Sequence, residues 1–307
     1  MQSLWMLFAS FLFAAMGVCV KLASQMFSTS EIVMYRGIVG VTVLLVLIRL
    51  QGATLKTKFA MGHLWRSVIG VISLWLWFFS IAKLPLATAM TLNYLSPIWI
   101  AVWLFAHGWW HAKNKVAWPL LVAVAMSFVG VVLLLQPAFQ SDLLVYALVA
   151  IFSSVLTAIA YMQVRKLGLA GEPESRVVFY FAVSNVVAGL LGTVAEAGGG
   201  PVVFHSLDTG HGFLLLLGIG LCATAAQISM TRAYRLGNTL VVANLQYTGI
   251  VFSSIWGVLV FSDNFDWHSW LGIGIILASG SAATFYNTRN TERGKAIAAT
   301  DPIASEV

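Results

Sequence analysis

Residues 84–112 read LPLATAMTLNYLSPIWIAVWLFAHGWWHA and contain no Asp, Glu, Lys or Arg. A helix that crosses the roughly 30 Å hydrocarbon core of a bilayer needs about 20 consecutive, mostly apolar residues. The uncharged stretch is longer than that. Residues 116–141 and 236–262 also lack all four charged residue types. These three stretches predict helices that are buried in a lipid bilayer.

The composition of the whole chain agrees with this prediction. Of its 307 residues, 60% are hydrophobic and 9% are charged, whereas soluble domains are about half apolar and a quarter charged. A soluble fold would have too few polar side chains to cover its surface. The net charge of +6 does not indicate nucleic-acid binding, because the basic residues lie in short clusters between apolar runs. Cys19 and Cys222 lie in apolar runs without CxxC spacing, so we expect no disulfide, metal site or cofactor.

The same length rule, applied along the chain, predicts an all-α integral membrane protein with ten transmembrane helices. They lie at about residues 4–23, 30–49, 63–83, 86–107, 117–136, 143–163, 176–196, 213–233, 239–262 and 268–287. No basic segment precedes the first apolar stretch, which favours an uncleaved first helix over a signal peptide. We expect residues 1–137 to form one five-helix repeat, residues 142–288 a second, and residues 289–307 a disordered cytoplasmic tail.

The distribution of basic residues predicts the orientation. Connections on the cytoplasmic side of membrane proteins are enriched in Lys and Arg. With the N-terminus in the cytoplasm, fourteen of the seventeen basic residues fall on inner connections or in the tail, and only Lys21, Arg36 and Lys83 lie toward the outer side. Both termini are therefore predicted to be cytoplasmic, in a multi-pass protein of the cell (inner) membrane.

Weak internal similarity predicts how the two repeats are related. At an offset of 145 residues Lys21 falls on Lys166, and at an offset of 152 Lys83 falls on Arg235. Each repeat would contain five helices, and an odd number forces the second repeat to insert upside down. Inverted repeats of this kind are common in secondary transporters, which bind substrate near the midplane of the bilayer between the repeats.

Four segments resemble a known family. They are GVCVKLAS with Lys21, EIVMYRG with Arg36, ATAMTLNYLSPIWIAVW with Pro97, and VFSDNFDW with Asp263. Together they are similar to the drug/metabolite transporter superfamily, EamA type, and the resemblance covers residues 4–287. The acidic residue that the family carries after the fourth helix is absent, since AHGWWHAKN has Trp110 or His111 there. The resemblance implies a ten-helix carrier of two inverted repeats, with a cavity lined largely by the third, fourth, eighth and ninth helices, that exports or exchanges amino acids or related metabolites.

Two basic residues lie within the predicted helices, about a turn inside their outer ends. Lys21 and Arg36 could form a positively charged mouth that attracts a carboxylate or phosphate of the substrate. The alternative is that both side chains extend to the outer lipid headgroups, with Glu31 as the partner of Arg36. No Asp, Glu or His lies near a predicted helix centre. Because proton-coupled carriers use such groups as relays, the sequence favours an uncoupled facilitator or exchanger.

Polar uncharged residues within the predicted spans are the candidates for substrate binding. They are Asn93, Tyr94 and Ser96 on the fourth helix, Gln227 on the eighth, and Asn244, Gln246 and Tyr247 on the ninth, with Trp75, Trp77 and Trp99 as an aromatic lining. Pro97 removes a backbone donor within its helix. We therefore predict hinges at Pro97 and at Gly249, its counterpart at the 152-residue offset. The alternative role of the polar residues is hydrogen bonding between helices.

These observations predict a secondary transporter that moves a small metabolite, most simply an amino acid or a related compound, by alternating access. A carrier of anionic nucleotide- or phosphate-bearing metabolites is the first alternative. A membrane scaffold or sensor subunit that transports nothing is the second. The chain has no HExxH, GxSxG or Asp-rich motif, so we do not expect an enzyme. The expected partners are a small-molecule substrate and the lipid bilayer; a homodimer is left open, and nucleic acid is not expected.

Overall fold

The computed structural model describes residues 4–100, 102–103, 143–198, 204–205, 210–237, 245–264 and 266–300, together with residues 200 and 242 and five isolated positions between 122 and 133. Within these ranges the ordered elements are all helices. Six of them are long and apolar enough, by length and composition, to cross a membrane. The predicted helix at 117–136 lies almost entirely outside the described residues.

The helices begin and end close to the predicted positions. The first half contains α1 (Trp5–Ala23), α2 (Thr29–Leu50), α3 (Ala60–Lys83) and α4 (Leu86–Asn93), and the second contains α7 (Leu144–Leu169), α8 (Glu174–Glu196), α9 (Gly210–Leu236), α11 (Thr248–Phe261) and α12 (Trp267–Thr300). Two differences matter for the interior. Helix α3 starts three residues earlier than predicted, and α4 is interrupted after Asn93. Helix α12 continues to Thr300, beyond the predicted span at 268–287.

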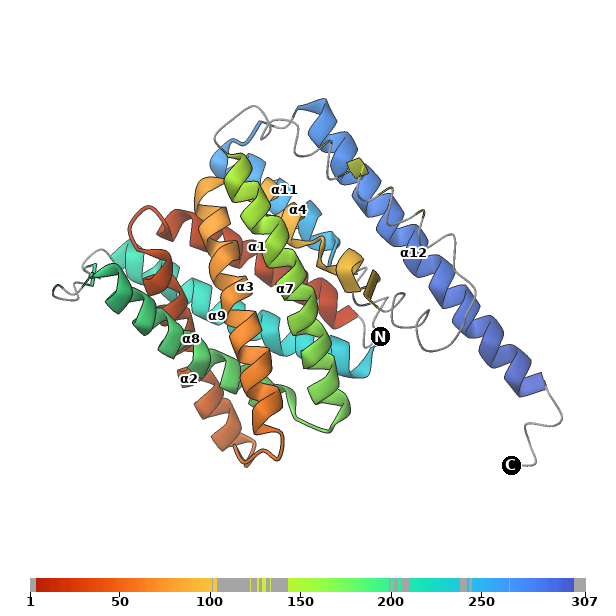
Figure 1. Ribbon diagram of the computed structural model, residues 1–307, viewed down its shortest axis with the longest axis horizontal. Coiled ribbons are helices and arrows are strands. Elements are labelled where there is room, and N and C mark those ends of the chain that lie inside the picture. Colours follow the sequence, from red (N-terminus) through yellow and green to blue (C-terminus); the bar gives the residue numbers. More distant parts are fainter. Residues whose placement is uncertain are drawn as a thin grey trace.

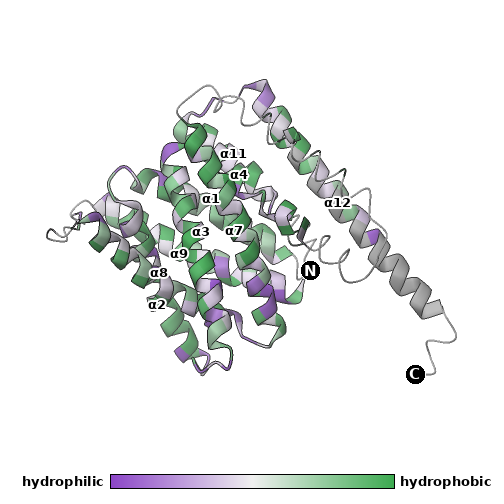
Figure 2. Ribbon diagram, in the orientation of Figure 1, coloured by the Kyte–Doolittle hydropathy of each residue, from purple (hydrophilic) through white to green (hydrophobic). Residues whose placement is uncertain are grey.

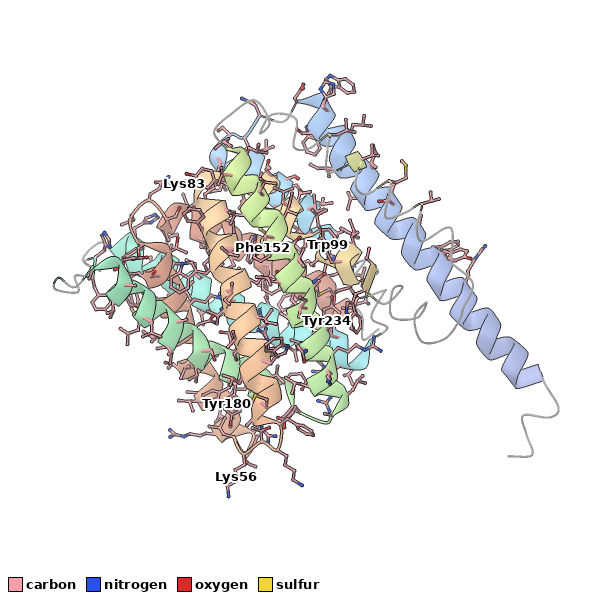
Figure 3. All side chains as sticks on the ribbon, viewed as in Figure 1. Lys56, Lys83, Trp99, Phe152, Tyr180 and Tyr234 are labelled. Carbon is pink, nitrogen blue, oxygen red and sulfur yellow. The ribbon has the colours of Figure 1, made fainter. Side chains whose placement is uncertain are left out.

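Helices of the first half pack mainly against helices of the second half. In the bundle of Figure 1, α1 packs against α9, α2 against α8, α3 against α7, and α4 against α11. Helix α12 stands to one side of this bundle and ends at Thr300. Figure 2 shows hydrophobic residues along the helices and hydrophilic ones gathered toward their ends. Lys56 and Lys83 lie at opposite ends of the bundle in Figure 3. This distribution suits a protein that is surrounded by lipid.

A capping box fixes the start of α2. The Ser28 side chain accepts a hydrogen bond from the Glu31 backbone N–H, and the Glu31 carboxylate accepts one from the Ser28 backbone N–H. The same carboxylate accepts a hydrogen bond from the His205 backbone N–H at 2.8 Å and lies 2.7 Å from Nδ1 of His205. Glu31 is therefore engaged at the helix start, and it does not pair with Arg36, contrary to the alternative that the sequence had suggested.

Glycines bring α2 and α8 into close contact. A Cβ atom on Gly37 would lie 2.7 Å from the backbone nitrogen of Val186, and one on Gly189 would lie 2.5 Å from that of Met34. Small residues allow helix backbones to approach in membranes, and these two glycines do so between α2 and α8. Gly274 differs, because a Cβ there would meet no atom within 4 Å.

Gly189→Ala should lower the melting temperature of the purified protein by several degrees. The added methyl group would meet backbone atoms of α2, which cannot move aside as a flexible side chain can, and overpacking of this kind costs about 1–3 kcal/mol. The measurement is thermal unfolding in detergent. Gly274→Ala is the matched control and should leave the melting temperature near that of the wild type. Equal melting temperatures for both variants would contradict the close packing of α2 and α8.

A cluster around Glu172 ties the connection between α7 and α8 to the start of α3. The buried carboxylate accepts hydrogen bonds from the Thr57 hydroxyl at 2.7 Å and from Nη1 of Arg176 at 3.0 Å, and it lies 3.2 Å from Nε2 of His63. Arg176 also donates two hydrogen bonds to the carbonyl oxygen of Thr54. Burial alone would raise the pKa of Glu172, but its three hydrogen-bonding partners and the charge of Arg176 hold that pKa below its ordinary value of 4.5.

The lowered pKa predicts how this cluster responds to acid. A carboxyl group whose pKa is lower in the folded state than in the unfolded state stabilises the fold above pH 4.5, and this contribution is lost as the pH falls through the folded-state pKa. Glu172→Gln should therefore lower the melting temperature at pH 7 and flatten its fall below pH 4.5. Asp266→Asn, which changes an exposed carboxylate, should lower the melting temperature at pH 7 by less. If the melting temperature of Glu172→Gln followed that of the wild type between pH 7 and pH 3, the cluster would not stabilise the fold.

Candidate functional site

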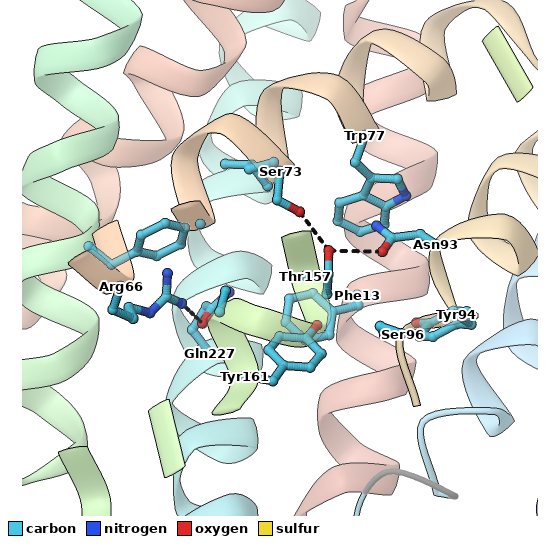
Figure 4. A pocket seen from close by; sticks show the side chains of 14 residues that line it. Phe13, Arg66, Ser73, Trp77, Asn93, Tyr94, Ser96, Thr157, Tyr161 and Gln227 are labelled. Atoms are coloured by element: carbon cyan, nitrogen blue, oxygen red, sulfur yellow. Dashed lines mark hydrogen bonds between the residues drawn. The ribbon is translucent and has the colours of Figure 1, made fainter. Parts of the chain in front are cut away.

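A cavity of about 50 Å³ lies in the middle of the bundle. Its walls come from α1, α3, α7, α8, α9, α4 and the turn that follows α4. The lining residues are Phe13, Arg66, Gly70, Ser73, Leu74, Trp77, Asn93, Tyr94, Ser96, Thr157, Ala160, Tyr161, Phe181 and Gln227. In Figure 4, Arg66 and Gln227 lie on one side of the cavity, and Asn93, Tyr94 and Ser96 lie on the other. Both halves of the chain thus contribute to one polar and aromatic space.

One wall is a chain of hydrogen-bonded hydroxyl and amide groups. The hydroxyls of Ser73 and Thr157 lie 2.6 Å apart, and Thr157 donates to Oδ1 of Asn93 at 3.2 Å. These bonds join α3, α7 and α4, and Figure 4 shows them as dashed lines. Asn93 donates no hydrogen bond to any described residue through its amide nitrogen, so this donor remains available at the cavity. The arrangement orients Asn93 as a hydrogen-bond donor toward a ligand.

The opposite wall carries Arg66, which is only 2% exposed. Its Nη2 donates a 3.3 Å hydrogen bond to Oε1 of Gln227, and its guanidinium carbon lies 3.7 Å from the centre of the Phe181 ring. Nε and Nη1 have no acceptor among the described residues. Gly70 makes room for the guanidinium, because a Cβ there would overlap Nη1. Arg66 is therefore a fixed cation with two unused donors at the cavity wall.

Arg36 also lies beside the ring of Phe181. It is 4% exposed, and its guanidinium carbon is 5.2 Å from the same ring centre. Its Nε has no acceptor. It lines a second, smaller cavity between α2, α8 and α9. The positive charges of Arg36 and Arg66 repel each other. In the part of the chain that the structure describes, no carboxylate forms an ion pair with either arginine.

The structure brings part of the predicted binding set together. Asn93, Tyr94, Ser96 and Gln227 line the central cavity, as does Trp77 from the predicted aromatic lining. Trp75 does not line it, because its ring packs against Gly192 of α8.

The other predicted binding residues lie outside the cavity lining. Trp99 donates a 2.9 Å hydrogen bond to the Ser154 hydroxyl. Gln246 and Tyr247 are buried behind the lining, where Gln246 hydrogen-bonds with the cavity residue Tyr161. Asn244 falls outside the described residues.

The two residues of the predicted mouth lie apart. Lys21 donates a 3.1 Å hydrogen bond to the carbonyl oxygen of Leu84, lies 4.8 Å from the ring centre of Phe261, and experiences the charge of Asp263. It thus joins α1 to the connection between α3 and α4. Arg36 is not at an outer mouth but in the interior beside Phe181. Its long side chain turns into the bundle instead of toward lipid headgroups.

Arg66 is the site residue that sequence reasoning missed. The sequence was interpreted with Arg66 in an inner connection, although it lies within the predicted span 63–83. Helix α3 begins at Ala60, so Arg66 lies about 9 Å along the helix axis at 1.5 Å per residue. The available signal was an arginine inside an otherwise apolar helix.

Both predicted hinges lie next to interrupted helices. After α4, Tyr94 and Leu95 form a turn, and helix resumes at Ser96, directly before Pro97. Gln246 and Tyr247 form a turn directly before α11. Gly249 allows a close approach between the two segments, because a Cβ there would overlap the Tyr94 hydroxyl. The two turns are 152 residues apart, which is the offset at which the sequence matched Pro97 with Gly249.

Comparison with known proteins identifies the family. The sequence model of the EamA-like transporter family matches residues 1–136. The pseudopaline exporter CntI of Pseudomonas aeruginosa is 32% identical over 259 residues, which cover 83% of this chain and 86% of the exporter. This chain belongs to the drug/metabolite transporter superfamily. Like its relatives it is a multi-pass integral membrane protein of EamA type, and these relatives are named as transporters.

Other members of the superfamily align along most of this EamA-type transporter. A Vibrio cholerae riboflavin transporter is 25% identical over 96% of this chain and 97% of its own length. A Rickettsia felis S-adenosylmethionine uptake transporter is 23% identical over 89% of this chain and 88% of its own length. A solved structure with 16% identity and a TM-score of 0.63 covers 91% of this chain and 96% of that chain, and it shows the same fold. Among the described residues, no group of His, Cys, Asp or Glu could hold a metal ion.

Gly70→Ala should reduce substrate exchange at least about tenfold, which corresponds to about 1.4 kcal/mol. The new methyl group would overlap Nη1 of Arg66 and lie 3.0 Å from Cε2 of Phe181, so the guanidinium must move. The measurement is the initial exchange rate in proteoliposomes per folded protein. Gly218→Ala is the matched control, since its Cβ would make an ordinary 3.5 Å contact with Sγ of Cys19. Wild-type exchange by Gly70→Ala would show that the position of Arg66 does not matter for transport.

Proposed function

We propose that this chain is a secondary transporter of the cell (inner) membrane that carries a small metabolite with a carboxylate, an amino acid or a related compound, through the central cavity. One observation carries the proposal: Arg66 is buried at the cavity wall with two donors that have no acceptor among the described residues. Arginines within membrane spans normally pair with other groups or mark the path of a substrate or ion. A substrate carboxylate would complete the missing pair.

The rest of the cavity suits an amphipathic metabolite. Trp77, Phe13 and Phe181 supply apolar and aromatic surface, while Asn93 and Tyr161 supply polar groups at the edges. Ligand sites typically combine mostly apolar walls with a few polar groups that fix orientation. The relatives' names support a small-metabolite substrate in general, since they include an exporter of pseudopaline and transporters of riboflavin and S-adenosylmethionine.

The size of the cavity supports the proposal of alternating access. Its volume of about 50 Å³ is far below the roughly 300–1,000 Å³ of typical ligand pockets. The helices must therefore separate before a metabolite can enter. The pairing of helices supports two inverted five-helix repeats. Suppose that α7, α8, α9 and α11 are the counterparts of α1, α2, α3 and α4. Exchanging the two repeats then converts the α1–α9 contact into the α3–α7 contact, and it converts the α2–α8 and α4–α11 contacts into themselves. We propose that movement occurs at the turns near Pro97 and Gly249, with both termini in the cytoplasm.

A phosphate-bearing substrate is the second candidate. A pair of arginines beside one aromatic ring, Arg36 and Arg66 at Phe181, favours a ligand with more than one negative charge. The bidentate geometry of a guanidinium matches phosphate as well as carboxylate. The same transport experiment separates the two candidates, because phosphate esters and carboxylates are tested in parallel.

The proposal is tested by counterflow in proteoliposomes that are preloaded with unlabelled amino acids, other carboxylates or phosphate esters, with no ion gradient imposed. We expect saturable exchange of at least one anionic compound. Arg66→Gln should reduce that exchange by about 10–100-fold, because a hydrogen bond to a charged group contributes about 1.5–3 kcal/mol. Arg66→Lys should retain part of it, since the charge remains.

Lys83→Gln is the control, because Lys83 lies exposed at the end of α3. It should exchange at the wild-type rate. Exchange restricted to uncharged or cationic compounds, or exchange unaffected by Arg66→Gln, would contradict the proposal. Uptake that appears only under a proton gradient would contradict the uncoupled mechanism while leaving the substrate class intact.

A further inference from the structure

The second cavity lies between α2, α8 and α9. Its volume is about 10 Å³, which is close to that of one water molecule, so the lining side chains must move apart slightly before a larger group such as a carboxylate can enter. Its lining includes Arg36, Asn185 and Thr224, and it shares Phe181 and Gln227 with the central cavity. The two spaces are therefore neighbours that are divided by one aromatic ring and one amide side chain.

Asn185 gives this small cavity an unusual polar wall. The residue is 0% exposed, yet neither Nδ2 nor Oδ1 has a hydrogen-bond partner in the described part of the chain. A buried amide without partners costs free energy comparable to several lost hydrogen bonds. The nearby Thr224 hydroxyl does not satisfy it, because that hydroxyl donates to the carbonyl oxygen of Gly220 at 2.7 Å. A ligand that accepts a hydrogen bond from Nδ2 would remove most of this cost.

Charge indicates which ligand that is. Arg36 is buried, its Nε is unpaired, and it experiences repulsion from Arg66. A single water molecule could satisfy the amide of Asn185, but it would leave the positive charge of Arg36 in place. Removing one partner from a buried ion pair is strongly destabilising, because the remaining charge is uncompensated. A small anion accepts a hydrogen bond from Nδ2 of Asn185 and also offsets the charge of Arg36.

We propose that this second cavity binds one small anionic group, a carboxylate or a halide, held by Arg36 and by Nδ2 of Asn185. The group has two potential sources. It is the second carboxylate of a transported dicarboxylic metabolite, a reading that rests on the proposed function, or a free inorganic anion such as chloride, which does not depend on it. In both cases the site is separate from the group bound at Arg66.

Anion-dependent thermal stability tests the site without any transport. The melting temperature of the full-length protein in detergent is measured in chloride, acetate and gluconate at equal ionic strength. A ligand that binds only the folded state raises the melting temperature. We expect chloride and acetate to raise it by a few degrees relative to gluconate, which is too large for the cavity.

Three variants assign that increment to the proposed residues. Arg36→Gln and Asn185→Leu should abolish the increment in chloride and acetate, and Arg66→Gln should keep it. Ser184→Ala is the matched control on α8, because that hydroxyl only donates to the carbonyl oxygen of Tyr180 in its own helix. Equal melting temperatures in all three salts, or an increment that survives in Arg36→Gln and Asn185→Leu, would overturn the proposal in favour of bound water.

Exchange measurements then separate the two sources. One outcome is that a dicarboxylate exchanges better than its monocarboxylate analogue and, by competition, cancels the rise in melting temperature that chloride causes. This outcome identifies the ligand of the site as the second carboxylate of the substrate. If monocarboxylate exchange requires chloride, the ligand of the site is the inorganic anion. A chloride increment that depends on Arg36 and Asn185, together with no exchange of any anionic compound, would support the anion site and contradict only the proposed function.

Discussion

The interior of this transporter is governed by one requirement: a guanidinium buried between membrane-spanning helices needs a negative charge nearby. Charges interact far more strongly in a low-dielectric interior than in water. Among the residues that the structure describes, Arg66 has only the amide of Gln227 and the ring of Phe181 as partners. Under the proposed mechanism the missing charge is the substrate itself. Pairing with the guanidinium then contributes to substrate binding.

That requirement also explains how the helices are built. Gly37 and Gly189 hold α2 and α8 in close contact, so these helices can move only as a pair. The proposed hinges are the turns after Asn93 and before Thr248, where two helices are interrupted. Irregular backbone at membrane depth is tolerated where it lines a cavity. In the proposed alternating-access mechanism, closely packed helix pairs move relative to one another about the interrupted helices.

Much of the fold could be predicted from the sequence, because apolar length sets the helices directly. The site could be predicted only in part. Apolar runs show that Trp75 and Trp77 lie on one helix, but only the packing of α3 shows that Trp77 faces the cavity and Trp75 faces Gly192. Arg66 escaped notice because it lies only three residues inside the predicted span 63–83 and was counted with the preceding inner connection. Arg36 was placed at the wrong depth because a long side chain can turn inward or outward from the same position.

The affinity ratio between a transported carboxylate and its own carboxamide tests the central claim most directly. The two ligands have nearly the same shape and differ in charge, so competition against labelled substrate isolates the contribution of the anion. The pairing with Arg66 predicts that the carboxamide binds about 10–100-fold more weakly, equivalent to about 1.5–3 kcal/mol. Equal affinity of the two compounds would show that the buried guanidinium does not recognise the substrate's charge, and the account of the cavity would then fail.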